Sequence, residues 1–152
     1  TMTAELYPEF APKTVENFLS LIDRNFFDGL IFHRIIKGFM IQGGGYDEKF
    51  DHRDAEAIKG EFAANGFMQN TLKHTRGVLS MARTSDPNSA SSQFFVMHKD
   101  APHLDAQYAG FGLVTDGLDV LDKIASVKTG SIGFYMQDVP REAVVIETIR
   151  RA

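Results

Sequence analysis

The stretch FHRIIKGFMIQGGG, residues 32–45, reads as two short apolar strands joined by a Lys-Gly turn. Successive side chains of a strand point to opposite faces, so Arg34 and Ile36 share one face, and beyond the turn Met40 and Gln42 share one face. Arg34 and Gln42 are therefore expected to meet beside apolar surface. A guanidinium is a multiple donor that keeps its proton, so it suits holding a carbonyl or polarising an amide better than removing a proton.

The composition is that of one compact domain. The chain has 152 residues, of which 43% are hydrophobic and 11% aromatic. A chain of this length can bury about two-thirds of its unfolded surface, so we expect a single domain over residues 1–152. No exposed heptad or apolar patch is evident, which makes a monomer the expected state. The absence of cysteine excludes disulfides, thiolate nucleophiles and Cys-type zinc sites.

Charge and hydropathy restrict the classes of partner that the chain is expected to bind. The net charge is −4 and no basic run is present, which argues against nucleic acid because phosphate binding needs clustered Lys and Arg. No apolar run approaches the roughly 20 residues that span a bilayer, and the amino end lacks the order of a signal peptide. We expect no membrane partner and a cytoplasmic location. Export is left open, because the chain opens inside an expected strand and its native amino terminus is not established.

Periodicity places two helices and several strands. Apolar residues recur after Pro12 at spacings of three, four and seven, which predicts a helix ending near residues 24–25. A shorter helix is predicted over residues 118–125. Strands are expected over residues 2–7, 30–36, 40–43, 78–82, 94–98, 111–114 and 144–149. Many short strands with few helices indicate a barrel or a sandwich.

Two polar loops are interpreted as solvated turns. Residues 43–59 mix acidic and basic side chains and fit no calcium-loop spacing. Residues 84–92 are rich in Ser, Asp, Pro and Asn, which is typical of turns. A nucleophilic serine there would need a base and an oxyanion hole, and the Gly-x-Ser-x-Gly pattern is absent. A hydrolase using the acidic loop is a further alternative.

The histidines do not show a metal-ligand spacing, and no metal site is expected. His33 alternates away from Arg34 and is expected in the core or against a helix. His74 is expected to be a hydrogen-bonded structural residue. His103 follows an Ala-Pro pair in a loop, which makes it the histidine best placed to touch a ligand.

Arg34 has two interpretations. By composition alone, a salt bridge to one of the 20 acidic residues is the simpler one. However, a second apolar strand opens on Gln93, and residues 79–83 contain the small Ala82, which would form a shallow pocket floor. Apolar walls with few polar groups are typical of a site for a small ligand or a peptide.

Several separated segments closely resemble the cyclophilins, which are peptidyl-prolyl cis-trans isomerases, and the bacterial branch most of all. The matching segments are residues 32–44, 77–82, 92–95 and 103–112, with further likeness over residues 5–18 and 145–147. The resemblance therefore covers nearly the whole chain. It implies a mainly β fold, namely a closed eight-stranded antiparallel β-barrel capped by two α-helices, with the peptide in a groove on the outer wall.

The resemblance also implies which residues form the site. Arg34 corresponds to the catalytic arginine, Gln42 to the glutamine beside it, and Phe39 completes the catalytic set. The implied substrate-binding residues are Ile36, Met40, Ala82, Gln93, Phe95, His103, Leu104 and Tyr108. Among these, Ala82 and Gln93 match positions that contact the peptide before the proline.

The implied activity is rotation of X-Pro bonds in unfolded or flexible segments, which assists folding and needs no metal or cofactor. Proline-containing peptides and unfolded proteins are the implied partners. His103 stands where many members carry a tryptophan that contacts cyclosporin, so cyclosporin is expected to bind with reduced affinity. A second hypothesis is a proline-peptide binding module whose turnover is incidental. Arg34 favours turnover, because binding alone would need only the pocket.

Overall fold

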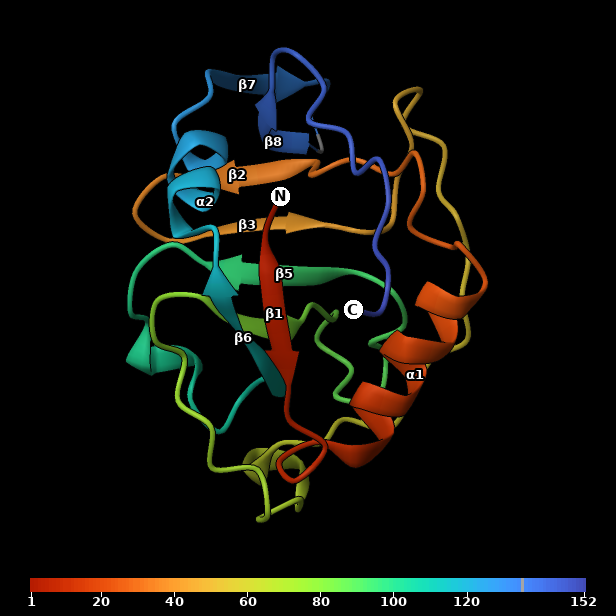
Figure 1. The fold of residues 1–152 in the computed structure, drawn as a ribbon, viewed down its shortest axis with the longest axis vertical. Helices are drawn as coiled ribbons and strands as arrows, with labels where there is room; N and C mark the ends of the chain where they lie inside the picture. Colours follow the sequence, from red (N-terminus) through yellow and green to blue (C-terminus); the bar gives the residue numbers. More distant parts are fainter. Residues whose placement is uncertain (135) are drawn as a thin grey trace.

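The computed structural model describes residues 1–134 and 136–152, which form a mainly β structure with two α-helices (Figure 1). The strands are β1 Thr3–Leu6, β2 Arg34–Ile36, β3 Met40–Gly43, β4 Val78–Met81, β5 Phe94–Met97, β6 Gly110–Asp116, β7 Thr129–Ile132 and β8 Met136–Pro140. The helices are α1 Pro12–Asp23 and α2 Leu118–Ala125, with short 3₁₀ turns η1 Ala63–Asn65 and η2 Pro102–Leu104. Neither α-helix in the described part of the chain has the length and apolar character needed to cross a membrane.

The strands pair antiparallel throughout. Six of them form one sheet in the order β1-β6-β4-β5-β3-β2, and β7 and β8 form a separate hairpin. The hairpin lies beside β2, and the two helices lie near opposite ends of the central strands (Figure 1). The eight strands and two helices match the number that the resemblance implies, with the paired strands forming a six-stranded sheet and a separate hairpin.

Alternation along the central strands gives the sheet two apolar faces. Ile35 pairs with Ile41 and Ile41 with Val96, and all three belong to the larger inner core. The neighbours Met40 and Phe95 point the other way and belong to a second, outer cluster. One strand register therefore produces both the core and an apolar platform on the outer wall.

Helix α1 closes the inner core. It begins at Pro12, whose fixed φ suits a first helical position. Its Phe18 is almost fully buried and contacts the rings of Phe27, Phe94 and Phe111, with centroids 5.1, 5.3 and 5.0 Å away. This aromatic cluster fixes the inner face of β5, whose outer face carries Phe95.

The largest differences between the predicted and the observed elements concern three segments. The helix over 118–125 is confirmed, and the helix from Pro12 ends at Asp23. The strand expected over 30–36 is shorter, since only residues 34–36 form a regular strand. The strand expected over 144–149 is wrong, because that segment makes only isolated bonds to residues 29–32. Strands β7 and β8 were not predicted, since their Gly, Ser, Asp and Pro residues have low β-propensity.

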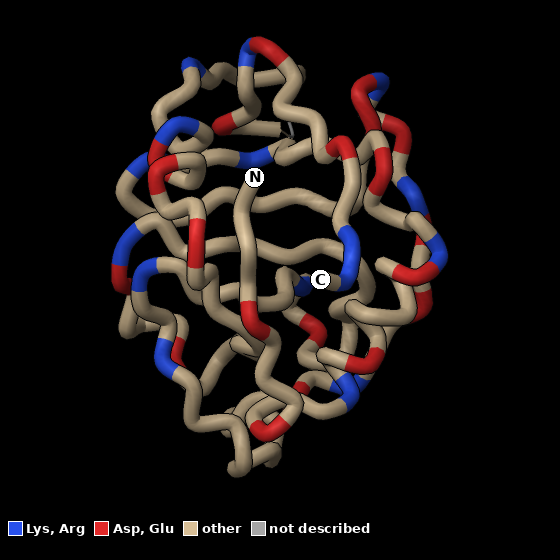
Figure 2. Tube along the Cα trace, viewed as in Figure 1, with Lys and Arg blue, Asp and Glu red and all other residues tan. Residues whose placement is uncertain are grey.

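The two polar loops are turns, as expected. The loop that contains residues 47–54 lies at the surface, with basic and acidic residues close together along the chain (Figure 2). In the other loop, the hydroxyl of Ser89 accepts hydrogen bonds from the backbone N–H and hydroxyl of Thr84, at 2.9 and 2.8 Å. Side-chain bonds of this kind stabilise tight turns. Neither loop contributes a residue to the outer apolar cluster.

Candidate active site

A row of directly paired residues crosses the outer face of the sheet. Arg34 on β2 pairs with Gln42 on β3, Gln42 with Phe95 on β5, and Phe95 with Ser80 on β4. Residues paired in this way project to the same face of an antiparallel sheet. The row therefore has a cation at one edge, an amide beside it and a phenylalanine ring near its centre.

The side chain of Arg34 is exposed and directed along this row. Its Nη1 donates to Oε1 of Gln42 at 3.3 Å, and Nε2 of Gln42 donates to Oε1 of Gln93 at 3.1 Å. Within the described ranges, no carboxylate forms an ion pair with Arg34, so the salt-bridge interpretation finds no partner. Because a guanidinium has five N–H donors and Gln42 takes one, the group keeps donors for a ligand.

An apolar platform adjoins the arginine. Its buried part consists of Met40, Val78, Phe95, Met97, Ala101 and Leu104. Its half-buried rim consists of Ile36, Phe39, Leu72, Ala82, Tyr108 and Leu113. Two aromatic contacts stiffen the rim: Phe39 stacks on His103 with centroids 5.8 Å apart, and Tyr108 meets Phe95 edge-on at 5.8 Å. Partly exposed apolar side chains around a buried floor can hold a small apolar ring.

The structure brings the predicted site residues together. Arg34, Gln42 and Gln93 form the hydrogen-bonded chain. The platform contains Ile36, Phe39, Met40, Ala82, Phe95, Leu104 and Tyr108. His103 is exposed in the short turn η2 and reaches the site through its stack on Phe39.

A second histidine fixes the turn before Phe39. Nδ1 of His98 accepts the backbone N–H of Gly38 at 2.8 Å, so its proton is on Nε2, which lies 3.0 Å from Oδ1 of Asp122. Arg76 holds the same carboxylate with two bonds of 2.8 and 3.0 Å, and the Arg76 guanidinium lowers the pKa of Asp122. Helix α2 thereby anchors the β2–β3 turn. These residues lie far apart in the sequence and share no local pattern, so sequence analysis missed them.

His74 is a hydrogen-bonded structural residue, as predicted. It is buried behind Phe95, on which it stacks with centroids 6.1 Å apart. Its Nε2 lies 2.8 Å from the hydroxyl of Ser80, and its Nδ1 lies 3.2 Å from Oδ1 of Asp105. Burial is the main cause that lowers the pKa of His74, and the Asp105 carboxylate opposes it. Because Asp105 follows Leu104, this contact also fixes one wall of the platform.

His33 lies in the core, on the face opposite Arg34. It is buried and packs against the ring of Tyr46 with centroids 4.8 Å apart. Among the described residues its Nδ1 has no hydrogen-bond partner. Burial, helped by the positive charge of Arg34, lowers the pKa of His33 to about 4. The imidazole is therefore neutral in the folded protein at pH 7.

Stability should fall between pH 7 and pH 5 because of His33. Its pKa is about 4 when folded and about 6.5 when unfolded. The unfolded state binds more protons in this window, so the free energy of unfolding rises with pH there. We expect His33 to account for about 2 kcal/mol of loss between pH 7 and pH 5.

Urea unfolding of the parent and His33→Phe at both pH values tests this. The variant should lose less stability over the same interval, by about the amount assigned to His33. An equal loss in both proteins would show that other groups carry the acid sensitivity.

Comparison with known proteins identifies this arrangement. The model of the family described as cyclophilin type peptidyl-prolyl cis-trans isomerase/CLD matches residues 1–151. The chain belongs to the cyclophilin family. It is an isomerase that catalyses proline cis-trans isomerisation, and the resemblance seen in its sequence is confirmed.

Bacterial relatives match this cyclophilin along most of their length. A peptidyl-prolyl cis-trans isomerase of Acinetobacter baylyi is 47% identical over 152 residues, covering 96% of this chain and 77% of the relative. Peptidyl-prolyl cis-trans isomerase B of Escherichia coli is 45% identical, and the match covers 94% of this chain and 88% of the Escherichia coli protein. The sequence similarity therefore extends well beyond the short motifs around Arg34.

Solved structures agree with the fold. A crystal structure of a Cryptosporidium parvum cyclophilin type peptidyl-prolyl cis-trans isomerase, determined in the presence of the dipeptide Ala-Pro, superposes with a TM-score of 0.79. It is 30% identical in sequence, and the match covers 97% of this cyclophilin and 89% of that chain. The mainly β fold with two helices is thus the fold of the family.

Proposed function

We propose that this cyclophilin isomerises X-Pro bonds on the outer face of its sheet, with Arg34 as the catalytic group. The observation that carries this is the exposed guanidinium of Arg34, bonded to Gln42 and adjoining an apolar platform. The Ala-Pro dipeptide present with the Cryptosporidium relative supports proline peptides as ligands. Unfolded or flexible protein segments, which expose X-Pro bonds, are the proposed substrates.

The chemistry requires a weaker amide bond and no covalent intermediate. The barrier of about 18–20 kcal/mol arises because the nitrogen lone pair is delocalised into the carbonyl. As the bond twists, the prolyl nitrogen becomes pyramidal and regains its lone pair. A donor placed at that nitrogen bonds the twisted state far better than the planar one. Arg34 would therefore stabilise the transition state selectively, which is what lowers a barrier.

The platform would hold the proline while the other side of the bond turns. The ring is proposed to sit on Phe95 and Met40, between Phe39 and Leu104, where apolar burial restrains it. Gln42 and Gln93 would orient the arginine and the peptide through the bonds already formed. Because the ring is fixed, only the carbonyl side of the bond would rotate. The prolyl nitrogen would then stay aligned with the Arg34 donor.

Turnover without cleavage is the test of this function. Uncatalysed X-Pro isomerisation takes tens to hundreds of seconds, slow enough to limit folding. The cyclophilin should accelerate cis-trans exchange of an Ala-Pro peptide and the proline-limited refolding of a model protein, and it should leave the peptide intact. Peptide binding with no acceleration would instead support the binding-module hypothesis, and cleavage would support a hydrolase.

Cyclosporin should bind with reduced affinity because of His103. An imidazole covers less apolar area than the indole that many cyclophilins have at this position, and it lacks the fixed indole donor. Restoring the larger ring in His103→Trp should tighten cyclosporin binding about tenfold, since ~50 Å² of extra apolar contact is worth about 1.4 kcal/mol. Inhibition titrations of both proteins measure this, and nanomolar inhibition of the parent would contradict it.

A further inference from the structure

A second arginine lies at the opposite edge of the site from Arg34. Arg83 directly follows Ala82, and its guanidinium lies between the rings of Phe62 and Tyr108, with its central carbon 4.8 and 4.6 Å from their centroids. Tyr108 in turn contacts Phe95 edge-on. The planar cation is therefore one aromatic ring away from the floor of the proposed proline pocket.

Backbone carbonyls hold this guanidinium in place. Nη2 and Nε of Arg83 donate to the carbonyl of Gln107 at 2.7 and 3.3 Å, and Nη1 donates to the carbonyl of Thr84 at 2.9 Å. These bonds leave further N–H groups of the fork without a protein acceptor among the described residues. A cation fixed by rings and carbonyls loses little side-chain entropy when a ligand arrives, which makes it a pre-organised binding group.

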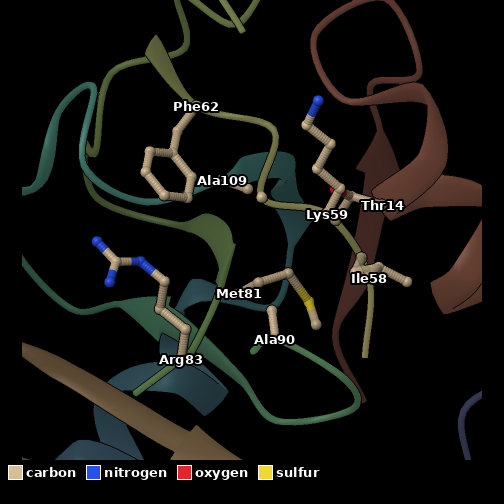
Figure 3. Close-up of a pocket in the computed structure, with 9 residues that line it drawn as sticks. Thr14, Ile58, Lys59, Phe62, Met81, Arg83, Ala90 and Ala109 are labelled. Carbon is tan, nitrogen blue, oxygen red and sulfur yellow. The ribbon is translucent and has the colours of Figure 1, made fainter. Parts of the chain in front are cut away.

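Arg83 also borders a shallow apolar hollow, with Lys59 at its other side (Figure 3). Phe62, Met81, Ala90 and Ala109 line the hollow between these two cations. The cavity itself is only about 10 Å³, room for no more than about one water. A ligand would thus lie over the hollow rather than inside it.

Neither cation is neutralised within the described residues. No ion pair joins Arg83 or Lys59 to a carboxylate there, although the chain as a whole has a net charge of −4. Glu61, two residues after Lys59, is buried, and its Oε1 accepts the backbone N–H and hydroxyl of Thr14 at 2.6 and 2.7 Å. Asp86, three residues after Arg83, accepts the backbone N–H of Asn88 at 2.8 Å and forms no ion pair among the described residues. This edge of the site therefore offers unpaired positive charge to a ligand.

The strand order relates the position of Arg83 to the part of the substrate that precedes the proline. The site crosses β2, β3, β5 and β4 in turn, and Ala82 extends the β4–β5 pairing by donating its N–H to the carbonyl of Gln93 at 3.0 Å. If the proline lies on Phe95, as proposed above, and the preceding residue lies over Ala82 and Gln93, as the resemblance implies, the amino-terminal arm of the peptide would run toward Arg83. Charged side chains on that arm would approach the guanidinium.

We propose that Arg83 selects substrates with an acidic residue two positions before the proline. The proposal rests on the proposed function, because it takes the position of the proline from it. A carboxylate at that position would gain a charge-assisted hydrogen bond from the Arg83 fork, whereas a lysine would be repelled. The gain falls with salt because the groups are partly exposed to solvent.

Matched peptides test the selectivity. The substrates are Glu-Ala-Pro-Phe, Gln-Ala-Pro-Phe and Lys-Ala-Pro-Phe with blocked ends, and their exchange is followed by NMR without a coupling protease. In the parent, kcat/KM should be about fivefold higher for the Glu than for the Lys peptide at low salt, a typical size for one partly exposed ion pair. Half-molar salt should remove most of this preference.

Two variants of Arg83 test whether this residue causes the preference for the Glu peptide. In Arg83→Gln the Glu/Lys ratio should approach one, and in Arg83→Lys part of the preference should return because the charge is kept. Lys123→Gln, an exposed α2 residue with the same change in net charge, should keep the parent ratio. A parent ratio near one, or an unchanged ratio in Arg83→Gln, would overturn the proposal. If the parent accelerates none of the peptides, the proposed function fails instead; normal turnover of the Gln peptide with no charge preference refutes only the role of Arg83.

Discussion

Replacing Arg34 by alanine is expected to lower kcat/KM on an Ala-Pro peptide by about 10²–10³, the range seen when one pre-organised transition-state donor is removed. The loss should appear mainly in kcat, because the proposed bond to the prolyl nitrogen forms only as the amide twists. The side chain is exposed and its only bond within the described structure is to Gln42, so the fold should be unaffected. NMR exchange rates and thermal unfolding measure the two effects separately.

Two companion variants sharpen this result. Arg34→Lys keeps the charge but loses the planar fork and its bond geometry, so it should recover only part of the activity. Lys123→Ala removes a positive charge on α2, away from the outer-face row, and should retain parental rates. An Arg34→Ala protein as active as the parent would mean that the arginine has no role in the chemistry.

The largest stability effect is expected for Phe18→Ala. The ring is buried among three other phenylalanines, so the substitution removes its burial, leaves a cavity and breaks three aromatic contacts. We expect a loss of about 4 kcal/mol, within the usual range for a buried Phe→Ala change. For a chain of this size that corresponds to a fall in Tm of roughly 8–16 °C.

Urea and thermal unfolding test this value against a surface control. Phe134 is 96% exposed, so Phe134→Ala should change stability by less than about 0.5 kcal/mol. A Phe18→Ala protein as stable as the Phe134→Ala protein would show that the aromatic cluster is not the main support of β5. At low temperature, folded Phe18→Ala should keep its activity, because the substitution lies on the inner face.

Local patterns predicted the parts of the molecule that depend on neighbours in sequence. The alternation in residues 32–45 placed Arg34 and Gln42 on one face, and the structure pairs them. The turn between them and the apolar spacing of α1 were equally local. The resemblance to cyclophilins then supplied residues from other elements, such as Phe95 on β5 and Leu104 in η2, which no spacing rule connects to Arg34.

The remaining features depend on tertiary contacts that leave little local signal. Strands β7 and β8 pair with each other, and their Gly, Asp and Pro residues weaken the strand signal in the sequence. The contact of His98 with Gly38 joins positions 60 residues apart. The position of Arg83 between two rings likewise depends on loops that only the folded chain brings together. Sequence analysis assigned no role to Arg83.

The central claim is that Arg34 bonds the twisted amide and hardly binds the planar one. Its most direct test is NMR exchange spectroscopy on an Ala-Pro peptide at saturating protein, which measures both the affinity and the cis-trans rate on the enzyme. For Arg34→Ala the account predicts a peptide Kd within about threefold of the parent and an on-enzyme rate lower by about 10²–10³. An unchanged on-enzyme rate with a much weaker Kd would contradict it, because Arg34 would then hold the substrate and not the transition state.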